Sequence, residues 1–146
     1  VPLPFVRQWI DNRTLMITGS AGSIGSEICR QLLKYSPKRL VLVDRSENGQ
    51  FFLDRGDHPA QQPVGSEVLE YGTDALEVHQ DGIPAGSRVL IIDDLLATGG
   101  TAAAAAKLVR AHFDVQILEI DFLLELTFLK GRKQLEGLPV HALVSC

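Results

Sequence analysis

Short apolar runs alternate with amphipathic or alanine-rich segments along most of the chain, a pattern that predicts strands alternating with helices. The apolar runs predict strands at residues 14–18, 40–43, 89–92, 115–122 and 140–144. The other segments predict helices at residues 4–10, 26–35 and 102–111, and a short helical turn at 130–135. Because this alternation is typical of right-handed crossovers between parallel strands, we expect an α/β fold of three layers, α/β/α, around a mainly parallel, Rossmann-like sheet.

The middle of the chain has a less regular pattern. Residues 46–55 favour a helix that would carry Phe51, Phe52 and Leu53 onto the sheet, although Gly49 weakens this reading. Residues 56–65 contain two prolines and several polar positions, which indicates a loop. Residues 68–70 and 76–78 are expected to pair as a β-hairpin inserted before the next parallel strand. We therefore expect one domain over residues 1–146.

Composition limits the partners and the compartment. The chain has 146 residues, 45% of them hydrophobic and 22% charged, with a net charge of −4, so a nucleic-acid-binding surface is not expected. No apolar run reaches membrane-spanning length and no signal peptide is visible, which predicts a cytoplasmic protein without membrane contact. Cys29 and Cys146 indicate no disulfide framework. The four histidines have no metal-ligand spacing, so no metal cluster of protein side chains is predicted.

Residues 89–101 combine a buried-type strand, two acids and a glycine turn before an alanine-rich helix. Glycines allow backbone N–H groups to approach an anion at a helix N-terminus. We therefore expect a phosphate to bind at Ala97, Thr98, Gly99, Gly100 and Thr101. Acceptor-only side chains suit a ribose diol or its magnesium ion.

Those acceptors are Asp93 and Asp94, at the carboxyl end of the strand. The alternative is a buried strand with an acidic end and no ligand.

The stretch D-D-L-L-A-T-G-G-T resembles the phosphoribosyl pyrophosphate (PRPP) loop of type I phosphoribosyltransferases, in its adenine-specific form. Residues 69–79 are similar to the flexible catalytic hairpin of adenine phosphoribosyltransferases, and residues 123–135 to the strand and turn that close their sheet. The resemblance covers residues 55–143. It implies that Asp93 and Asp94 hold the ribose hydroxyls, that the turn holds the 5-phosphate, and that Mg²⁺ enters only with PRPP.

The same resemblance implies catalytic roles for Glu70 and Tyr71, with Glu70 as acid or base toward a purine and Tyr71 as a shield over the reacting centre. The alternative is a solvated hairpin tip with one packed ring. Both interpretations stay open on the sequence.

The first part of the chain has a different character, with a short strand, three glycines, a helix and a second strand that ends in Asp44. Gly19, Gly22 and Gly25 form G-x-x-G-x-x-G, and this order is typical of a dinucleotide-binding βαβ unit. Residues 1–54 resemble extended short-chain dehydrogenases that act on nucleotide sugars, of the polysaccharide-biosynthesis 4,6-dehydratase type. The Tyr-x-x-x-Lys pair of that family is absent, so turnover of a nucleotide sugar is not expected. NAD(P) binding is not expected because half of the usual dinucleotide crevice is missing, and pure scaffolding is an equal alternative for this loop.

Two family resemblances thus meet near residues 52–57. We expect an engineered chimera that binds a phosphate, a phosphoribosyl group or a nucleotide and requires no cofactor. Little or no catalysis is expected, because the base-covering N-terminal segment of adenine phosphoribosyltransferases has no counterpart in residues 1–13. Two alternatives remain: a weak transferase that converts PRPP and adenine to AMP and pyrophosphate, and a structural scaffold without a ligand. A homodimer is possible, and the sequence does not decide the oligomeric state.

Overall fold

The computed structural model describes residues 4–19, 22–43, 51–54, 68–71, 76–79 and 82–146. Side chains are described for residues 7–19, 22–43 and 82–146. Among these described residues, no helix is long and apolar enough to cross a membrane.

A six-stranded sheet forms the centre of the protein, in the order β3-β2-β1-β6-β7-β8. Its strands are β1 (Thr14–Thr18), β2 (Arg39–Val43), β3 (Phe51–Asp54), β6 (Ser87–Leu96), β7 (Val115–Glu125) and β8 (Val140–Ser145). Five of these strands are parallel, whereas β3 pairs with β2 in the antiparallel direction. The predicted mainly parallel sheet is confirmed.

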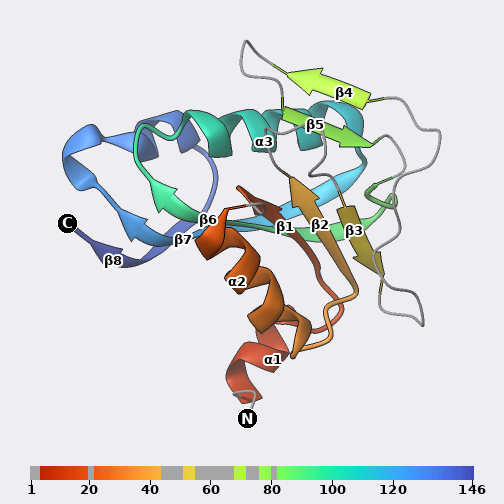
Figure 1. Ribbon diagram of the computed structural model, residues 1–146. Coiled ribbons are helices and arrows are strands. Elements are labelled where there is room, and N and C mark those ends of the chain that lie inside the picture. The colour runs from red at the N-terminus through yellow and green to blue at the C-terminus, as the bar shows by residue number, and fades with distance from the viewer. Residues whose placement is uncertain (1–3, 20–21, 44–50, 55–67, 72–75, 80–81) are drawn as a thin grey trace.

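Helices cover both faces of this sheet and produce the predicted three layers (Figure 1). They are α1 (Pro4–Ile10), α2 (Ser23–Leu33) and α3 (Gly100–His112), followed by the 3-10 turns η1 (Thr127–Leu129) and η2 (Gly131–Leu135). The face under α3 holds one buried cluster, which includes Val89, Ile91 and Leu108. The opposite face holds a smaller cluster around Leu15, Ile17 and Cys29, in which α1 and α2 take part.

The predicted hairpin is confirmed as a separate two-stranded sheet of β4 (Val68–Tyr71) and β5 (Leu76–His79). It lies on the α3 side of the main sheet, and β4 runs beside α3 (Figure 1).

The predicted helix over residues 46–55 is wrong, because Phe51–Asp54 forms the edge strand β3. Aromatic residues favour a half-buried pleated surface, and here they pair with the free edge of β2. Helix α2 begins at Ser23 rather than at Ser26, because Gly22 serves as its N-cap and the third glycine of the motif lies inside the helix. Strand β6 continues to Leu96, past both acids that the sequence places at its end.

The strand order reverses between β1 and β6. From β1 the chain crosses through α2 to β2 on one side, and from β6 it crosses through α3 to β7 on the other. Strands β1 and β6 are parallel neighbours, with Thr14 beside Val89 and Ile17 beside Ile92. Open α/β sheets bind ligands at the carboxyl ends of the strands at such a switch point. The fold therefore brings the two glycine loops of the sequence to the same edge.

The 3-10 turn η2, which follows β7, is held to the sheet by hydrogen bonds to the buried carboxylate of Glu125. Arg132 donates from Nε and Nη2 to the two carboxylate oxygens of Glu125, each at 2.8 Å, and from Nη1 to the Val140 carbonyl oxygen. Ser145 also donates to Glu125. The side chain of Glu125 is only 6% exposed, and the fork from Arg132 lowers the pKa of Glu125. The turn that follows β7 is thus held by charge-assisted hydrogen bonds.

Candidate functional site

The loop between β6 and α3 contains the predicted phosphate-binding residues. Gly99 has φ +86° and ψ −1°, a left-handed conformation that favours glycine, and it is the N-cap of α3 without a side-chain cap. Within the described part of the chain, no backbone carbonyl outside the helices and strands accepts from the amides of residues 97–100. Thr98 and Gly100 are exposed, and Ala97 and Thr101 are half-buried. The amides that lead into α3, up to that of Gly100, thus point to a candidate anion position at the start of the helix.

The conformation of this loop is fixed by close backbone contact with η2. A Cβ placed on Gly99 would lie 2.4 Å from the Gly131 carbonyl oxygen, and a Cβ placed on Gly131 would lie 2.4 Å from the Ala97 carbonyl oxygen. The two glycines therefore allow a backbone-to-backbone contact that a larger residue at either position would prevent. Turn η2 thus supports the loop between β6 and α3. The sequence alone does not predict this contact.

The two acids lie in different environments. Asp93 is 7% exposed, and its Oδ1 accepts the Asp94 backbone N–H at 2.7 Å. Asp94 is half-buried. Burial raises the pKa of Asp93 to about 7, and the neighbouring Asp94 carboxyl also raises it, while the Thr18 hydroxyl lowers it. Asp94 is consequently the more accessible of the two predicted ribose acceptors.

The dinucleotide-type loop lies directly beside these acids. A Cβ placed on Gly19, at the end of β1, would lie 3.9 Å from Asp93 Oδ1. The Thr18 hydroxyl donates to the Ile92 carbonyl oxygen on β6 at 3.4 Å. Gly22 caps α2, and its N–H donates to the Gly19 carbonyl at 3.2 Å. Both glycine loops therefore border one site.

The remaining predicted residues are placed less fully. Gly25 is buried within α2, as expected for a glycine that permits close packing of the helix on the sheet. Asp44 lies outside the described residues. Glu70 and Tyr71 lie in β4, opposite Glu77 and Leu76 of β5. Their side chains are outside the description, so their catalytic roles stay predictions.

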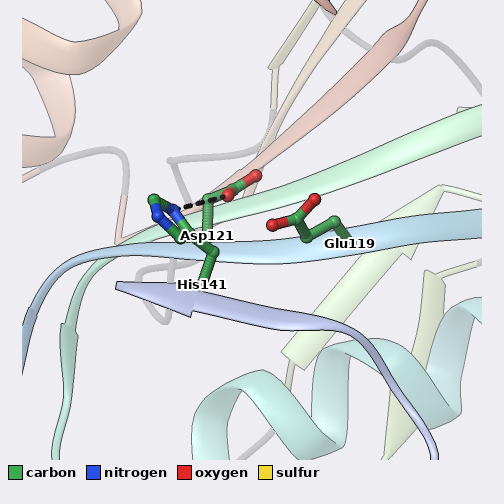
Figure 2. A group of neighbouring side chains, drawn as sticks. All are labelled: Glu119, Asp121 and His141. Carbon is green, nitrogen blue, oxygen red and sulfur yellow. Dashed lines mark ion pairs between the residues drawn. The ribbon is translucent and has the colours of Figure 1, made fainter. Parts of the chain in front are cut away.

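The structure also brings together three potential metal ligands that the sequence prediction did not anticipate. Glu119, Asp121 and His141 each offer one ligand atom, and these atoms lie within 4.8 Å of one another. Figure 2 shows the three side chains on the same side of β7 and β8. Burial raises the pKa of Asp121 to about 6, with a further rise from Glu119 and an opposing effect of His141. The sequence-based prediction of no metal cluster rests on the histidine spacing alone and does not consider this group, so it stays a prediction.

Sequence reasoning missed this group because the ligands belong to two strands. Glu119 and Asp121 alternate along β7, and His141 is the register partner of Asp121 on β8. The only local signal was the pair of acids separated by one apolar residue on a predicted strand.

Known proteins resemble the chain in two different ways. A curated adenine phosphoribosyltransferase from Acaryochloris marina is 53% identical over 89 residues, which are 61% of this chain and 52% of that protein. A solved adenine phosphoribosyltransferase from Rhodothermus marinus is 34% identical with a TM-score of 0.67, and the match covers 98% of this chain and 73% of that one. The chain belongs to the adenine phosphoribosyltransferase family. It nevertheless spans about half the length of the curated relatives it matches.

Two further solved members of the adenine phosphoribosyltransferase family match at this level. The Thermoanaerobacter pseudethanolicus structure has 30% identity and a TM-score of 0.68, covering 97% of this chain and 79% of that one. The Saccharomyces cerevisiae structure, complexed with D-2,5-dideoxy-2,5-imino-altritol 1,6-bisphosphate and adenine, has 29% identity and a TM-score of 0.67, covering 93% and 68%. The structural likeness thus extends well beyond the 61% of the chain that matches curated sequences.

A second family accounts for the first part of the chain. A family model described as polysaccharide biosynthesis protein matches residues 15–71. The predicted combination of two family segments is therefore confirmed. The match ends at residue 71 rather than at the predicted residue 54, so it also includes β4.

Proposed function

We propose that this protein binds a ribose 5-phosphate group, free or within a nucleotide, at the carboxyl ends of β1 and β6. The observation that supports this most directly is the left-handed Gly99, which ends the β6 loop at the N-terminus of α3. In this described segment, no backbone carbonyl outside the helices and strands accepts from the amides of residues 97–100. The phosphate would accept from amides of residues 97–101. Hydrogen bonds to a charged group contribute about 1.5 to 3 kcal/mol each, so a few such donors suit micromolar to millimolar affinity.

The ribose hydroxyls would then donate to the neighbouring carboxyls. Asp94 is the main acceptor in this proposal, because it is half-buried whereas Asp93 is nearly inaccessible. Asp93, with a pKa of about 7, carries a proton in a large part of the molecules at neutral pH. This proton reduces the repulsion between the buried carboxyl and a phosphate in the adjacent loop. Mg²⁺ is expected only with a pyrophosphate-bearing ligand such as PRPP, and no cofactor is required.

We further propose that the chain is an engineered chimera with little or no catalysis. Its first loop, Gly19 to Gly25, belongs to the segment that matches the polysaccharide biosynthesis family, yet it borders the phosphoribosyltransferase-type acids. Phosphoribosyl transfer needs a pyrophosphate site at this position, and a displacement of reacting groups by about an ångström can reduce the rate about a hundredfold. The Tyr-x-x-x-Lys pair of the dehydratase chemistry is absent from the sequence.

Isothermal titration with ribose 5-phosphate and with inorganic phosphate tests the binding proposal. Asp94→Asn should weaken ribose 5-phosphate binding about tenfold, because a charge-assisted acceptor for a hydroxyl is lost. It should leave inorganic phosphate binding unchanged or stronger, because a negative charge near the anion is removed. Asp114→Asn, at an exposed position before β7, is the matched control.

Absence of heat with both ligands at millimolar concentration would refute the proposal, as would equal effects of Asp94→Asn and Asp114→Asn on ribose 5-phosphate. A native-state ligand also raises the melting temperature. A melting temperature that neither ligand changes would favour the structural scaffold.

Residual transfer of the phosphoribosyl group to adenine is the second candidate function. The family membership and the hairpin beside α3 favour it. Its test is AMP formation from PRPP, adenine and Mg²⁺ in a long single-turnover reaction, compared between the unchanged chain and Glu70→Gln. No AMP from the unchanged chain would exclude this activity, and equal rates in the two proteins would exclude the proposed role of Glu70.

A further inference from the structure

We propose that Glu119, Asp121 and His141 form a binding site for a divalent transition-metal ion, with Zn²⁺ as the best representative, on the face of the sheet that α1 and α2 partly cover. This site would be separate from the ribose phosphate site. Asp121 is the register partner of Ile92 on β6, whereas the Gly99 loop lies beyond the end of that strand. No part of the proposed function depends on it.

The geometry of the three side chains is close to that of a metal site. His141 Nδ1 lies 3.6 Å from Asp121 Oδ1, and all three ligand atoms lie within 4.8 Å of one another. Tetrahedral Zn²⁺ with bonds of about 2.0 to 2.2 Å places its ligand atoms about 3.4 Å apart. The histidine and Asp121 already satisfy this spacing. The ligand atom of Glu119 lies within 4.8 Å of the other two, and any remaining adjustment of about an ångström is within reach of a half-buried side chain with three rotatable bonds.

The strands hold the ligands without any loop. Glu119 and Asp121 are two residues apart on β7, so they project from the same face, and His141 is directly paired with Asp121 across the β7–β8 ladder. Figure 2 shows the carboxyl groups and the imidazole directed to one side of these two strands. A site built on paired strands is more rigid than one built on loops, which reduces the entropy lost on metal binding.

The charges of this group support a cation. Within the described residues, no lysine or arginine forms an ion pair with Glu119 or Asp121, and the half-exposed imidazole of His141 is their basic neighbour. Two carboxylates on one face of one strand repel each other. They also border a groove of about 480 Å³ whose other lining is mainly apolar, including Trp9 and Leu143. A divalent ion would neutralise both carboxylates and remove this repulsion.

The donor set selects the class of metal. Imidazole nitrogen together with carboxylate oxygen suits Zn²⁺, Co²⁺ or Mn²⁺, whereas Mg²⁺ and Ca²⁺ prefer oxygen ligands alone. Three protein ligands leave at least one coordination position open toward the groove, where water or a small anion would bind. The bound ion would also join the edge strand β8 to β7 and so stabilise this side of the sheet.

Zinc titration of the EDTA-treated full chain tests this proposal, in a Cys146→Ser background that removes the exposed thiol as a competing ligand. We expect one equivalent of Zn²⁺ to bind and to raise the melting temperature. His141→Ala and Glu119→Gln should each weaken binding about tenfold or more. His112→Ala, at an exposed position near the end of α3, is the matched control and should bind as the background chain does.

Absence of Zn²⁺ binding at sub-millimolar concentration would overturn the proposal. So would equal affinity in His141→Ala, Glu119→Gln and the control, because the ion would then be bound elsewhere. Circular dichroism of each metal-free variant verifies its fold, and Glu119→Gln decides the outcome if His141→Ala is unfolded. The visible absorption of bound Co²⁺ gives a second readout, which should disappear in both ligand variants but persist in Asp94→Asn.

Discussion

Replacement of Asp93 by asparagine should stabilise the protein at alkaline pH and have a much smaller effect in acid. Asp93 is buried at the centre of the sheet, and its pKa is raised from 3.8 to about 7 by loss of solvation and by the neighbouring Asp94 carboxyl. The folded chain therefore binds this proton more tightly than the unfolded chain does. The stability from the protonated carboxyl is fully present below about pH 4 and is lost as the pH rises through about 7.

The size of the effect follows from the pKa difference. One pKa unit corresponds to about 1.4 kcal/mol, so ionising Asp93 in the folded state costs about 4 kcal/mol above pH 7. Between pH 5 and pH 8 the expected loss is about 2 to 3 kcal/mol, because part of the cost is already present at pH 5. Asparagine has a similar shape, keeps an oxygen that can accept the Asp94 N–H, and cannot ionise.

Urea unfolding of both proteins at pH 5 and pH 8 measures this difference. Other titrating groups, including Asp121, are common to both chains and largely cancel in the comparison. The free energy of unfolding of Asp93→Asn, relative to the unchanged chain, should increase by about 2 to 3 kcal/mol from pH 5 to pH 8. A difference that stays constant across this range would refute the burial argument for Asp93.

Two further substitutions test the supports of the site. In urea unfolding, Gly99→Ala should lower the free energy of unfolding by about 2 kcal/mol more than Gly137→Ala. Both glycines have φ near +85°, but only at Gly99 would the added Cβ lie 2.4 Å from a carbonyl oxygen. Equal losses would mean that the backbone around Gly131 shifts to accommodate the Cβ. Arg132→Met should cost about 1 to 2 kcal/mol at pH 7 and less at acid pH, because the pKa of Glu125 is lowered and the stability from its ionised form is lost as the pH falls through this lowered pKa. An equal cost at both pH values would indicate lost packing instead.

Much of the fold could be predicted from periodicity, because short apolar runs that alternate with amphipathic or alanine-rich segments leave few alternatives. Strands β1, β2, β6, β7 and β8 all form where the sequence predicts them, with small differences at their ends. The sequence predicts a helix that includes Phe51–Asp54, since four residues fit either period, and only pairing with the edge of β2 makes this run a strand. Local sequence carries no information about which strand edge is available.

The sequence predicts which residues make up the candidate site, but it does not predict how buried they are or what they contact. The glycine turn and its acids are read directly from the order D-D-L-L-A-T-G-G-T. The burial of Asp93 depends on Thr18 and Gly19 of a neighbouring strand 74 residues away in sequence. The support of Gly99 by Gly131, and the proximity of His141 to Asp121, likewise depend on register between distant segments.

The boundary between the two family segments crosses the middle of the sheet at one pair of strands, β1 and β6. Parallel pairing there uses main-chain groups that every sequence possesses, and the adjoining side chains, such as Leu15 and Leu90, are aliphatic. Two strands can therefore pair at this junction even when they come from unrelated families. A foreign strand–helix–strand unit of matching length and handedness should therefore be exchangeable at this point, and new ligand loops could be installed on the same C-terminal half without redesign of its core.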